Sequence, residues 1–365
     1  MGTSTEISWT DKTWNFAHGC FKISPGCKNC YAIRSVERLA RQMQHTAKAD
    51  YYKGIAENGN WTGTVKIHEE NLRAPLAWNA PSRIFVASLS DPFHEAISDE
   101  TLDRAFAIMA LTPQHTYQLL TKRPERALQW FTAKRPITDT KTDVAFWAVQ
   151  ASRTAKLYDG RGIVWDGRGP DWWRYTRESE YDVRNRRPFG WPLPNVWIGV
   201  SVENQATADQ RIPILLQIPA GKRFLSCEPL LGPVDLVYPT FNGADSLVSL
   251  EGLHWVIVGG ESGPGYRPMN PSWARSIRDQ CVRGGVSFFY KQDAAPRPGT
   301  RPELDGVTWY QFPADAPRLA PTGPPLRGLE APTPPPSLQI KSKAESSSQA
   351  FAMFNQAELN YAPKK

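Results

Sequence analysis

Thr-Trp-Asn-Phe-Ala-His-Gly-Cys-Phe-Lys-Ile-Ser-Pro-Gly-Cys-Lys-Asn-Cys-Tyr, residues 13–31, is the stretch from which the fold of this chain is best inferred. It contains three of the five cysteines, Cys20, Cys27 and Cys30, with the spacing C-x6-C-x2-C. The turn-forming residues 24–26, Ser-Pro-Gly, are expected to bring Cys20 back towards the other two. Three thiolates leave one position open in a four-ligand centre, and an open position usually takes a substrate or cofactor. The stretch therefore predicts a metal centre with a free position.

Two kinds of metal centre are compatible with this spacing. A structural zinc site normally needs four protein ligands, and His18 could be the fourth. No second C-x2-C pair and no H-x3-H pair completes a familiar zinc ribbon. The other interpretation is a [4Fe–4S] cluster held by the three cysteines, with its fourth iron free to bind S-adenosylmethionine. The spacing alone leaves both alternatives open.

Composition limits the class of protein. A chain of 365 residues with 41% apolar residues can bury a substantial core. It has no run of about 18 apolar residues and no secretory signal at its start, so we expect a cytoplasmic protein with no membrane contact. An odd number of cysteines, three of them clustered, favours a reducing compartment and metal binding over disulfides. The net charge of +7 permits a polyanionic partner.

The hydrophobic pattern alternates between strand-like and helix-like segments. A strand, a polar loop and a helix recur about six or seven times, which favours a parallel sheet with helical crossovers. No glycine-rich phosphate fingerprint opens the chain, so we predict an α/β fold with a partial or closed parallel (β/α) barrel. The expected strands are 14–16, 83–88, 116–120, 196–200, 223–226, 255–258 and 286–290, and the expected helices are 31–43, 99–111, 125–132, a segment ending near 217, and 271–283.

Polar side chains follow the strands, at the edge of the sheet that carries the chemistry in such folds. Lys122 and Arg123 are candidates to bind a carboxylate or phosphate of the substrate, or else form a solvated strand end. Ser201, Glu203 and Asn204 are candidates to bind ribose hydroxyls of a cofactor. The alternative for Asn204 is a helix cap.

Later strand ends supply further candidates. Gly259 and Gly260 form a turn that carries Glu261, which could bind an amino group or ribose hydroxyls; alternatively the glycines only allow the bend. Lys291 follows the last strand and is a third candidate for substrate binding.

Two cysteines lie outside the cluster. Cys227 ends a strand and is followed by Glu228, and we assign both as catalytic candidates, with Cys227 as a hydrogen-atom donor to a substrate radical. The alternative is an inert buried thiol. Cys281 falls within an expected helix and is assigned to the core.

We expect one barrel domain over residues 6–314, with its cluster loop at 18–31. Residues 148–194 contain eight arginines and several aromatic residues and are interpreted as an insertion, either packed on the rim or contacting nucleic acid. Residues 315–365, rich in Pro, Ser and Ala, predict a flexible, disordered tail.

Six ordered motifs resemble those of the phage gp thirty-seven/gp sixty-eight family, over about residues 6–314. That family is similar to radical SAM enzymes in its cysteine loop and barrel. The motifs are the cysteine stretch from Trp14 to Ala32, Ser-Asp-Pro-Phe-His (90–94), Leu-Thr-Lys-Arg-Pro (120–124), Gly-Val-Ser-Val-Glu-Asn (199–204), Cys-Glu-Pro-Leu-Leu-Gly-Pro (227–233) and Gly-Gly-Glu-Ser-Gly (259–263).

The chain also departs from the radical SAM pattern. The usual cysteine spacing is C-x3-C-x2-C, and the first gap is longer here. The Gly-Gly-Glu that holds the methionyl amine usually follows the second strand, whereas here it follows a late one. Ser88, Ser90 and Asp91 occupy the second-strand position, and Ser90 and Asp91 are the alternative amine site.

The resemblance implies an enzyme with a [4Fe–4S] cluster and S-adenosylmethionine as cofactors. The cluster would cleave S-adenosylmethionine to methionine and a 5′-deoxyadenosyl radical, which would take a hydrogen atom from a substrate. Positive charge and the phage association suggest a nucleobase in DNA or RNA as substrate. An electron donor for the cluster is a further expected partner. The rival is a zinc-stabilised nucleic-acid-binding protein without radical chemistry.

Overall fold

The computed structural model describes residues 3–133, 192–236 and 250–314. The predicted tail at 315–365 lies outside these residues, as does the predicted insertion at 148–194 apart from its last three residues. No described helix combines the length and apolar character that a membrane crossing requires.

One sheet organises the described part of the chain. Its order is β1-β2-β7-β8-β9-β10-β11-β12, and every neighbouring pair from β2 to β12 is parallel, whereas β1 is antiparallel to β2. The strands span β1 (Thr3–Ser4), β2 (Lys12–Trp14), β7 (Arg83–Val86), β8 (Thr116–Thr121), β9 (Val196–Ser201), β10 (Lys222–Cys227), β11 (Trp255–Gly259) and β12 (Ser287–Gln292).

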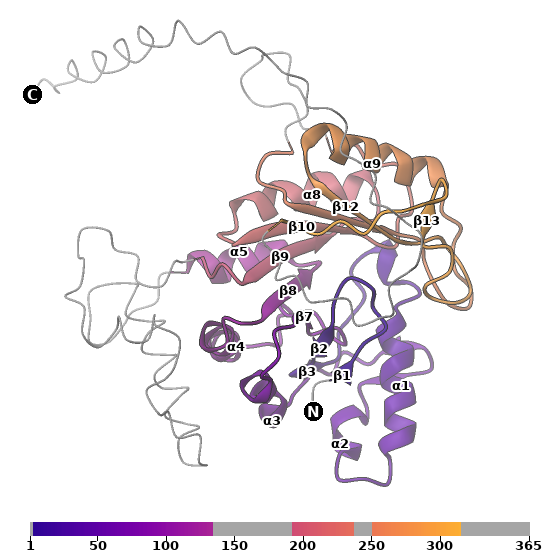
Figure 1. Cartoon of the computed structure of the whole chain (residues 1–365). Coiled ribbons are helices and arrows are strands. Elements are labelled where there is room, and N and C mark those ends of the chain that lie inside the picture. The colour runs from indigo at the N-terminus through magenta and orange to yellow at the C-terminus, as the bar shows by residue number, and fades with distance from the viewer. Residues whose placement is uncertain (1–2, 134–191, 237–249, 315–365) are drawn as a thin grey trace, which may run out of the picture. The chain divides into compact units, whose positions relative to one another are not determined.

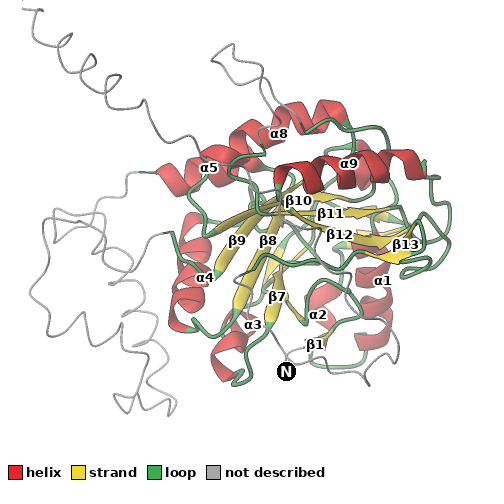
Figure 2. Cartoon of the chain, turned by 45° about the horizontal axis from the view of Figure 1, so that its top comes forward, coloured by secondary structure: helices red, strands yellow, loops and turns green. Residues whose placement is uncertain are grey.

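The parallel strands lie side by side in chain order. Right-handed crossovers in a sheet that never reverses its order place the crossover helices on the same face, and the sheet curls round the other face. The helices lie along one side of the curved sheet (Figures 1 and 2). In the described residues β12 pairs with neither β1 nor β2, so the barrel is partial. The predicted α/β fold is confirmed in its partial-barrel form.

The long helices fall where periodicity predicts them. Asn204 begins α8 with a capping box, in which its side chain accepts from the Thr207 N–H and the Thr207 hydroxyl accepts from the Asn204 N–H. The helix-cap alternative for Asn204 is therefore confirmed. The helices span α1 (Tyr31–Met43), α4 (Asp99–Leu111), α5 (Pro124–Thr132), α8 (Gln205–Gln217) and α9 (Pro271–Gly284).

Short elements lie outside the main sheet, most of them in residues 45–80, which were expected to be irregular. Among the short strands that the structure describes there, only β3 with β6 joins distant residues, which local periodicity does not reveal. The short elements are β3 (Ala17–His18), η1 (Pro25–Cys27), α2 (Ala49–Tyr52), β4 (Ala56–Glu57), β5 (Asn60–Trp61), β6 (Lys66–Ile67), α3 (Glu69–Leu72), η2 (Ala74–Ala77), β13 (Glu303–Leu304) and β14 (Val307–Thr308).

Side chains along the strands alternate between two separate cores. One set packs with the helices in the outer core, as Val200 and Leu225 do. The other set fills the concave side of the sheet. There Gly199 makes room for Phe224, because a Cβ at residue 199 would lie 2.5 Å from the Phe224 ring. We call this second set the inner aromatic cluster; it comprises Trp9, Phe85, Trp197, Phe224, Trp255, Ile257 and Phe289.

Candidate functional site

The three clustered cysteines lie in the connection from β2 to α1, near the carboxyl end of the first parallel strand. Cys27 closes the η1 turn, and Cys30 directly precedes α1. None is in a disulfide; Cys27 is buried, and Cys20 and Cys30 are partly buried. Burial raises the pKa of Cys20 to about 12, with Asp91 adding to the shift and Arg123 opposing it. Burial also raises the pKa of Cys30.

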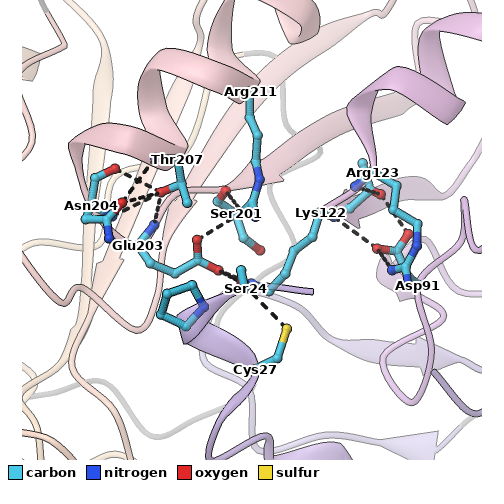
Figure 3. Close-up of polar contacts among 12 residues, drawn as sticks. Ser24, Cys27, Asp91, Lys122, Arg123, Ser201, Glu203, Asn204, Thr207 and Arg211 are labelled. Carbon is cyan, nitrogen blue, oxygen red and sulfur yellow. Dashed lines mark hydrogen bonds and ion pairs between the residues drawn. The ribbon is translucent and has the colours of Figure 1, made fainter. Parts of the chain in front are cut away.

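Glu203 attaches this cysteine loop to the end of β9. Its carboxylate is fully buried, and Oε1 accepts hydrogen bonds from Lys122 Nζ at 2.7 Å and Ser24 Oγ at 2.8 Å. Arg211 Nη1 donates to the other oxygen at 2.9 Å. The Ser24 hydroxyl in turn lies 3.6 Å from Cys27 Sγ (Figure 3).

The charge of Glu203 follows from these partners. Burial alone would raise its pKa, but Lys122 and Arg211 outweigh burial and lower it to about 2. The carboxylate is therefore ionised at neutral pH. Glu203 is fully buried and its carboxylate bonds to Lys122, Arg211 and the loop, so it is not open to the ribose for which the sequence proposed it. Lys122 pairs with Glu203 and keeps 18% of its side chain exposed.

Asp91 and Arg123 hold the loop beside Cys20 in the same manner. Asp91 Oδ1 accepts hydrogen bonds from Thr121 Oγ1 at 2.7 Å and from the Phe93 N–H at 2.9 Å. Asp91 Oδ2 accepts hydrogen bonds from the Lys122 N–H at 3.0 Å and from Arg123 Nη1 at 3.1 Å. Each carboxylate oxygen thus has two donors, which leaves Asp91 little capacity for a cofactor amine.

Arg123 is only 5% exposed, and it extends from Asp91 to the thiol. Its Nε lies 3.0 and 3.1 Å from the carboxylate oxygens of Glu95, and its Nη1 donates to Cys20 Sγ at 3.8 Å. The guanidinium also covers the ring of Phe21 at 4.5 Å. Arg123 therefore belongs to the support of the loop, and the sequence-based assignment to substrate binding does not match its burial.

Ser90 supports the residue before Cys20. Its Oγ donates to the Gly19 carbonyl at 2.6 Å, and the Gly19 N–H donates to the Leu89 carbonyl at 3.1 Å. Gly19 has a φ of 107°, and a Cβ there would lie 2.1 Å from the Thr64 carbonyl oxygen. Only glycine fits at residue 19, where the backbone passes this close to the Thr64 carbonyl.

Glu261 contacts the opposite side of the loop. Its carboxylate accepts hydrogen bonds from Arg267 Nε at 2.9 Å, from Arg267 Nη2 at 2.5 Å and from Asn29 Nδ2 at 2.9 Å. Arg267 Nη1 also donates to the Pro25 carbonyl at 3.0 Å. Burial would raise the pKa of Glu261, but the hydrogen bonds from Arg267 and Asn29 lower it. Glu261 thus holds Pro25 and Asn29 of the cysteine loop, a role that its position on a glycine turn did not predict.

The glycines before Glu261 have separate steric roles. A Cβ at Gly260 would lie 2.1 Å from the Ala294 backbone nitrogen, so the turn packs directly on the chain after β12. A Cβ at Gly259 would lie 3.3 Å from Glu228 Cδ, which places the Glu228 side chain across this position.

Glu228 and Lys291 form an ion pair and remain partly accessible, with side chains 19% and 18% exposed. Strand alternation places Glu228 on the concave side, because it follows Phe224 by four residues, and the ion pair places Lys291 beside it. The pair therefore stands beyond the inner aromatic cluster, at the carboxyl end of the sheet. The Tyr31 hydroxyl donates to the Ser88 carbonyl at 2.8 Å, and burial raises its pKa, with smaller contributions from Cys30 and Glu228.

Cys227 points the other way. It is fully buried in the outer core, on the helix side of β10, and burial raises its pKa. A hydrogen-atom donor to a substrate on the concave side would need the opposite face, so the inert-thiol alternative matches this position. Cys281 lies in the same core, as predicted.

Four residues that the sequence did not single out for a site complete these contacts: Ser24, Asn29, Arg211 and Arg267. Ser24 was predicted only as part of a turn. Arg211 is a buried cation inside α8, where its Nη1 also donates to the Ser201 carbonyl at 2.7 Å. A buried arginine implies a buried carboxylate partner, and this was the signal available.

The donor set was tested against the metal centres that the sequence allows. Within residues 3–133, 192–236 and 250–314, no three His, Cys, Asp or Glu side chains are gathered closely enough to hold a single metal ion. The three free thiols share one loop, however, and the loop is fixed from the ends of β7, β8, β9 and β11. Thiolates are the ligands of iron–sulfur clusters. The chemistry of this donor set fits such a cluster, with Cys20, Cys27 and Cys30 as its ligands.

The Gly26→Ala variant is expected to lose about 1–3 kcal/mol of unfolding free energy and to retain less iron. The added Cβ would lie 2.4 Å from Glu203 Oε1 and 2.5 Å from its Cγ, so the loop must move away from Glu203. Urea denaturation and iron analysis of the reconstituted protein measure the two effects. Gly232→Ala is the matched control, because its nearest contact would be an ordinary 3.5 Å to Asn204 Cβ. Equal behaviour of the two variants would show that the loop does not pack on Glu203.

Comparison with known proteins adds a family and a distant structural likeness. No curated protein matches the chain. Among solved structures, the chain is similar to spore photoproduct lyase complexed with dinucleoside spore photoproduct, with a TM-score of 0.35 and 10% identity over 77% of this chain and 63% of that chain. The sequence matches the family described as "Protein of unknown function (DUF5131)" over residues 4–313. The phage family name suggested by the motifs remains a prediction. The chain belongs to the DUF5131 family.

Proposed function

We propose that the protein is a radical SAM-like iron–sulfur enzyme that cleaves S-adenosylmethionine and acts on a substrate at the concave side of the partial barrel. One observation carries the proposal: a loop with three free thiols is anchored to four strand ends, at the edge of a parallel sheet where such folds place their chemistry. When bound by these thiols and reduced by an electron donor, a [4Fe–4S] cluster would supply the one electron for reductive cleavage of S-adenosylmethionine to methionine and a 5′-deoxyadenosyl radical.

The chain's own residues have three tasks in this proposal. Cys20, Cys27 and Cys30 supply thiolates, and a fourth coordination position stays open. Arg123 places a cation 3.8 Å from Cys20 Sγ, which favours the thiolate form of that ligand. Glu203 and its cationic partners keep the loop from moving when the thiols lose their protons.

Glu228 and Lys291 are the groups that we assign to the amino-acid part of S-adenosylmethionine. That part carries an ammonium and a carboxylate. Glu228 offers a carboxylate to the ammonium, and Lys291 offers an ammonium to the carboxylate. Glu261 and Asp91, the sites suggested by sequence, already have protein donors on both carboxylate oxygens. The partial exposure of Glu228 and Lys291 supports the new assignment.

Anaerobic reconstitution with iron and sulfide, followed by dithionite reduction, tests the proposal. The reduced protein is expected to convert S-adenosylmethionine into 5′-deoxyadenosine and methionine, measured by mass spectrometry. Glu228→Gln is expected to keep its iron and to bind S-adenosylmethionine roughly ten- to a hundredfold more weakly, the effect of losing one charge-assisted contact. Glu261→Gln is the comparison variant, and it is expected to lose iron because its loop contacts weaken.

Two outcomes would contradict the proposal. A fully loaded, reduced protein that yields no 5′-deoxyadenosine rules out cleavage of the cofactor. A colourless protein that purifies with one zinc ion favours the rival, a zinc-stabilised nucleic-acid-binding protein. A Glu228→Gln variant with unchanged affinity would remove Glu228 from the cofactor site and leave the remainder of the proposal in place.

A further inference from the structure

Exposed apolar side chains gather around the cysteine loop. Seven large apolar residues are exposed in the part of the chain that the structure describes, and four of them adjoin this loop; the other three are Val282, Val307 and Tyr310. Phe21 and Ile23 belong to the loop, and Tyr31 directly follows Cys30. Tyr266 stands between two residues bonded to the loop, because Asn29 donates to the Gly265 carbonyl at 2.9 Å and Arg267 donates to Pro25. We call Phe21, Ile23, Tyr31 and Tyr266 the exposed rim.

Two aromatic rings of the rim, those of Phe21 and Tyr31, are held in place. Phe21 has the Arg123 guanidinium 4.5 Å from its ring centre, and His94 packs edge-on at 4.7 Å. The Tyr31 hydroxyl is fixed by the Ser88 carbonyl. Even so, 40% of Phe21, 46% of Tyr31 and 39% of Tyr266 stay exposed. Rings that are already fixed lose little conformational entropy when a planar group stacks on them.

Two exposed lysines lie in the same loop as Phe21 and Ile23. Lys22 lies between Phe21 and Ile23, and Lys28 lies between Cys27 and Cys30; both are exposed. Lys22 Nζ donates to the neutral Asn60 Oδ1 at 2.8 Å. Across residues 3–133, 192–236 and 250–314, neither lysine forms an ion pair with a carboxylate. Their positive charge is therefore available to an anionic partner.

This arrangement matches one class of partner. Single-stranded nucleic acids bind where aromatic rings stack on bases and cations follow the phosphate backbone. Bases in a duplex are already stacked on each other, so separate protein rings favour an unpaired strand. We infer that single-stranded DNA or RNA docks on the exposed rim, with Phe21 and Tyr266 stacking on bases and Lys22 and Lys28 contacting phosphates. That this strand is the substrate rests on the proposed function; the docking does not.

Fluorescence anisotropy with a labelled single-stranded oligonucleotide of about 12 nucleotides, in both DNA and RNA forms, tests the inference on the full-length reconstituted protein. Phe21→Ala and Tyr266→Ala are each expected to weaken binding roughly five- to a hundredfold. Tyr266→Phe keeps the ring and is expected to keep the affinity. The Lys22→Ala/Lys28→Ala double variant is expected to flatten the slope of log affinity against log salt by about 1.4, since each phosphate contact contributes about 0.7.

Tyr310→Ala is the matched aromatic control, because Tyr310 is 42% exposed and its ring stacks on Phe289, which is not a residue of the cysteine loop. Lys48→Ala, an exposed lysine that precedes α2, is the control for charge. Neither should change affinity or salt slope. Iron content and melting temperature are measured for every variant, so that a loss of binding by an unfolded or iron-free protein is not counted as a result.

The outcomes separate the docking surface from the proposed function. If oligonucleotide binding depends on the rim but S-adenosylmethionine yields no 5′-deoxyadenosine, the docking proposal stands and the proposed enzymatic function is refuted. Cofactor cleavage without oligonucleotide binding at low salt overturns the surface and leaves the enzyme. The docking proposal is also overturned if Tyr310→Ala weakens oligonucleotide binding as much as Tyr266→Ala does. It is overturned as well if the oligonucleotide does not bind and an acidic electron-carrier protein binds in a Tyr266-dependent manner.

Discussion

A Cys27→Ala variant is expected to bind no iron–sulfur cluster after reconstitution, and to produce no 5′-deoxyadenosine. Cys27 is the buried thiol of the three, and it ends the η1 turn that Ser24 and Pro25 attach to Glu203 and Arg267. Removing it leaves two thiolates, too few for a cluster that needs three. Cys20→Ala and Cys30→Ala should behave alike for the same reason. Iron and sulfide per chain, with the visible absorption of the cluster, measure the loss.

Cys281→Ala provides the control for this series. Cys281 is fully buried in the outer core, so its replacement removes a thiol of similar burial without touching the loop. It is expected to keep its full iron content, with some loss of stability from the cavity. Full iron in the Cys27→Ala protein would refute the assignment of these cysteines as cluster ligands.

Glu203→Gln is expected to destabilise the fold by about 3–5 kcal/mol at neutral pH, and to release the cysteine loop. The change leaves Arg211 buried and Lys122 partly buried without their negative partner, and it weakens the contact with Ser24. Urea denaturation measures the unfolding free energy. The iron content of the reconstituted protein reports whether the cysteine loop still holds its cluster. The exposed-pair control is Glu69→Gln, in which Glu69 is 57% exposed opposite Arg104. It should cost less than about 1 kcal/mol.

The effect of Glu203 should depend on pH in a defined direction. Its pKa is about 2 in the folded protein, against 4.5 for the ordinary group. Between these values the unfolded chain binds the proton and the folded chain does not, so falling pH favours unfolding. The contribution, about 3 kcal/mol, is complete above pH 4.5 and is lost as the pH falls towards 2. The stability difference between wild type and Glu203→Gln should therefore narrow between pH 5 and 3. A difference that is independent of pH would show that Glu203 acts without its charge.

The residues proposed from sequence as cofactor ligands mostly support the loop that carries the thiols. Ser90 and Asp91 follow β7, Glu203 follows β9 and Glu261 follows β11, and each contacts the loop or a residue that contacts it. All four therefore lie at the carboxyl edge of the sheet, where these contacts support the loop. Their loss should be detected first as loss of iron, before any effect on the affinity for S-adenosylmethionine.

The sequence by itself determined the long helices and the parallel strands, and their order. Helical periodicity placed α1 at 31–43 and α4 at 99–111, the bounds that the structure shows, because a 3.6-residue repeat is a local property. The recurring strand–loop–helix pattern predicted parallel strands, and consecutive strands then form a partial barrel. The cysteine spacing identified the central loop. The helix cap at Asn204 was likewise visible as an alternative, since caps depend on residues three positions apart.

Only the tertiary structure decided which polar groups remain free. Ser24 is 179 residues from Glu203, Asn29 is 232 from Glu261 and Pro25 is 242 from Arg267, and no local pattern encodes such pairs. Whether a carboxylate can bind a ligand depends on the donors that already surround it. The register of β10 also turned Cys227 towards the helices and Glu228 towards the concave side, because neighbouring residues in a strand face opposite ways. Local periodicity is therefore enough to place a strand end, but the charges brought to it by distant segments determine its chemistry.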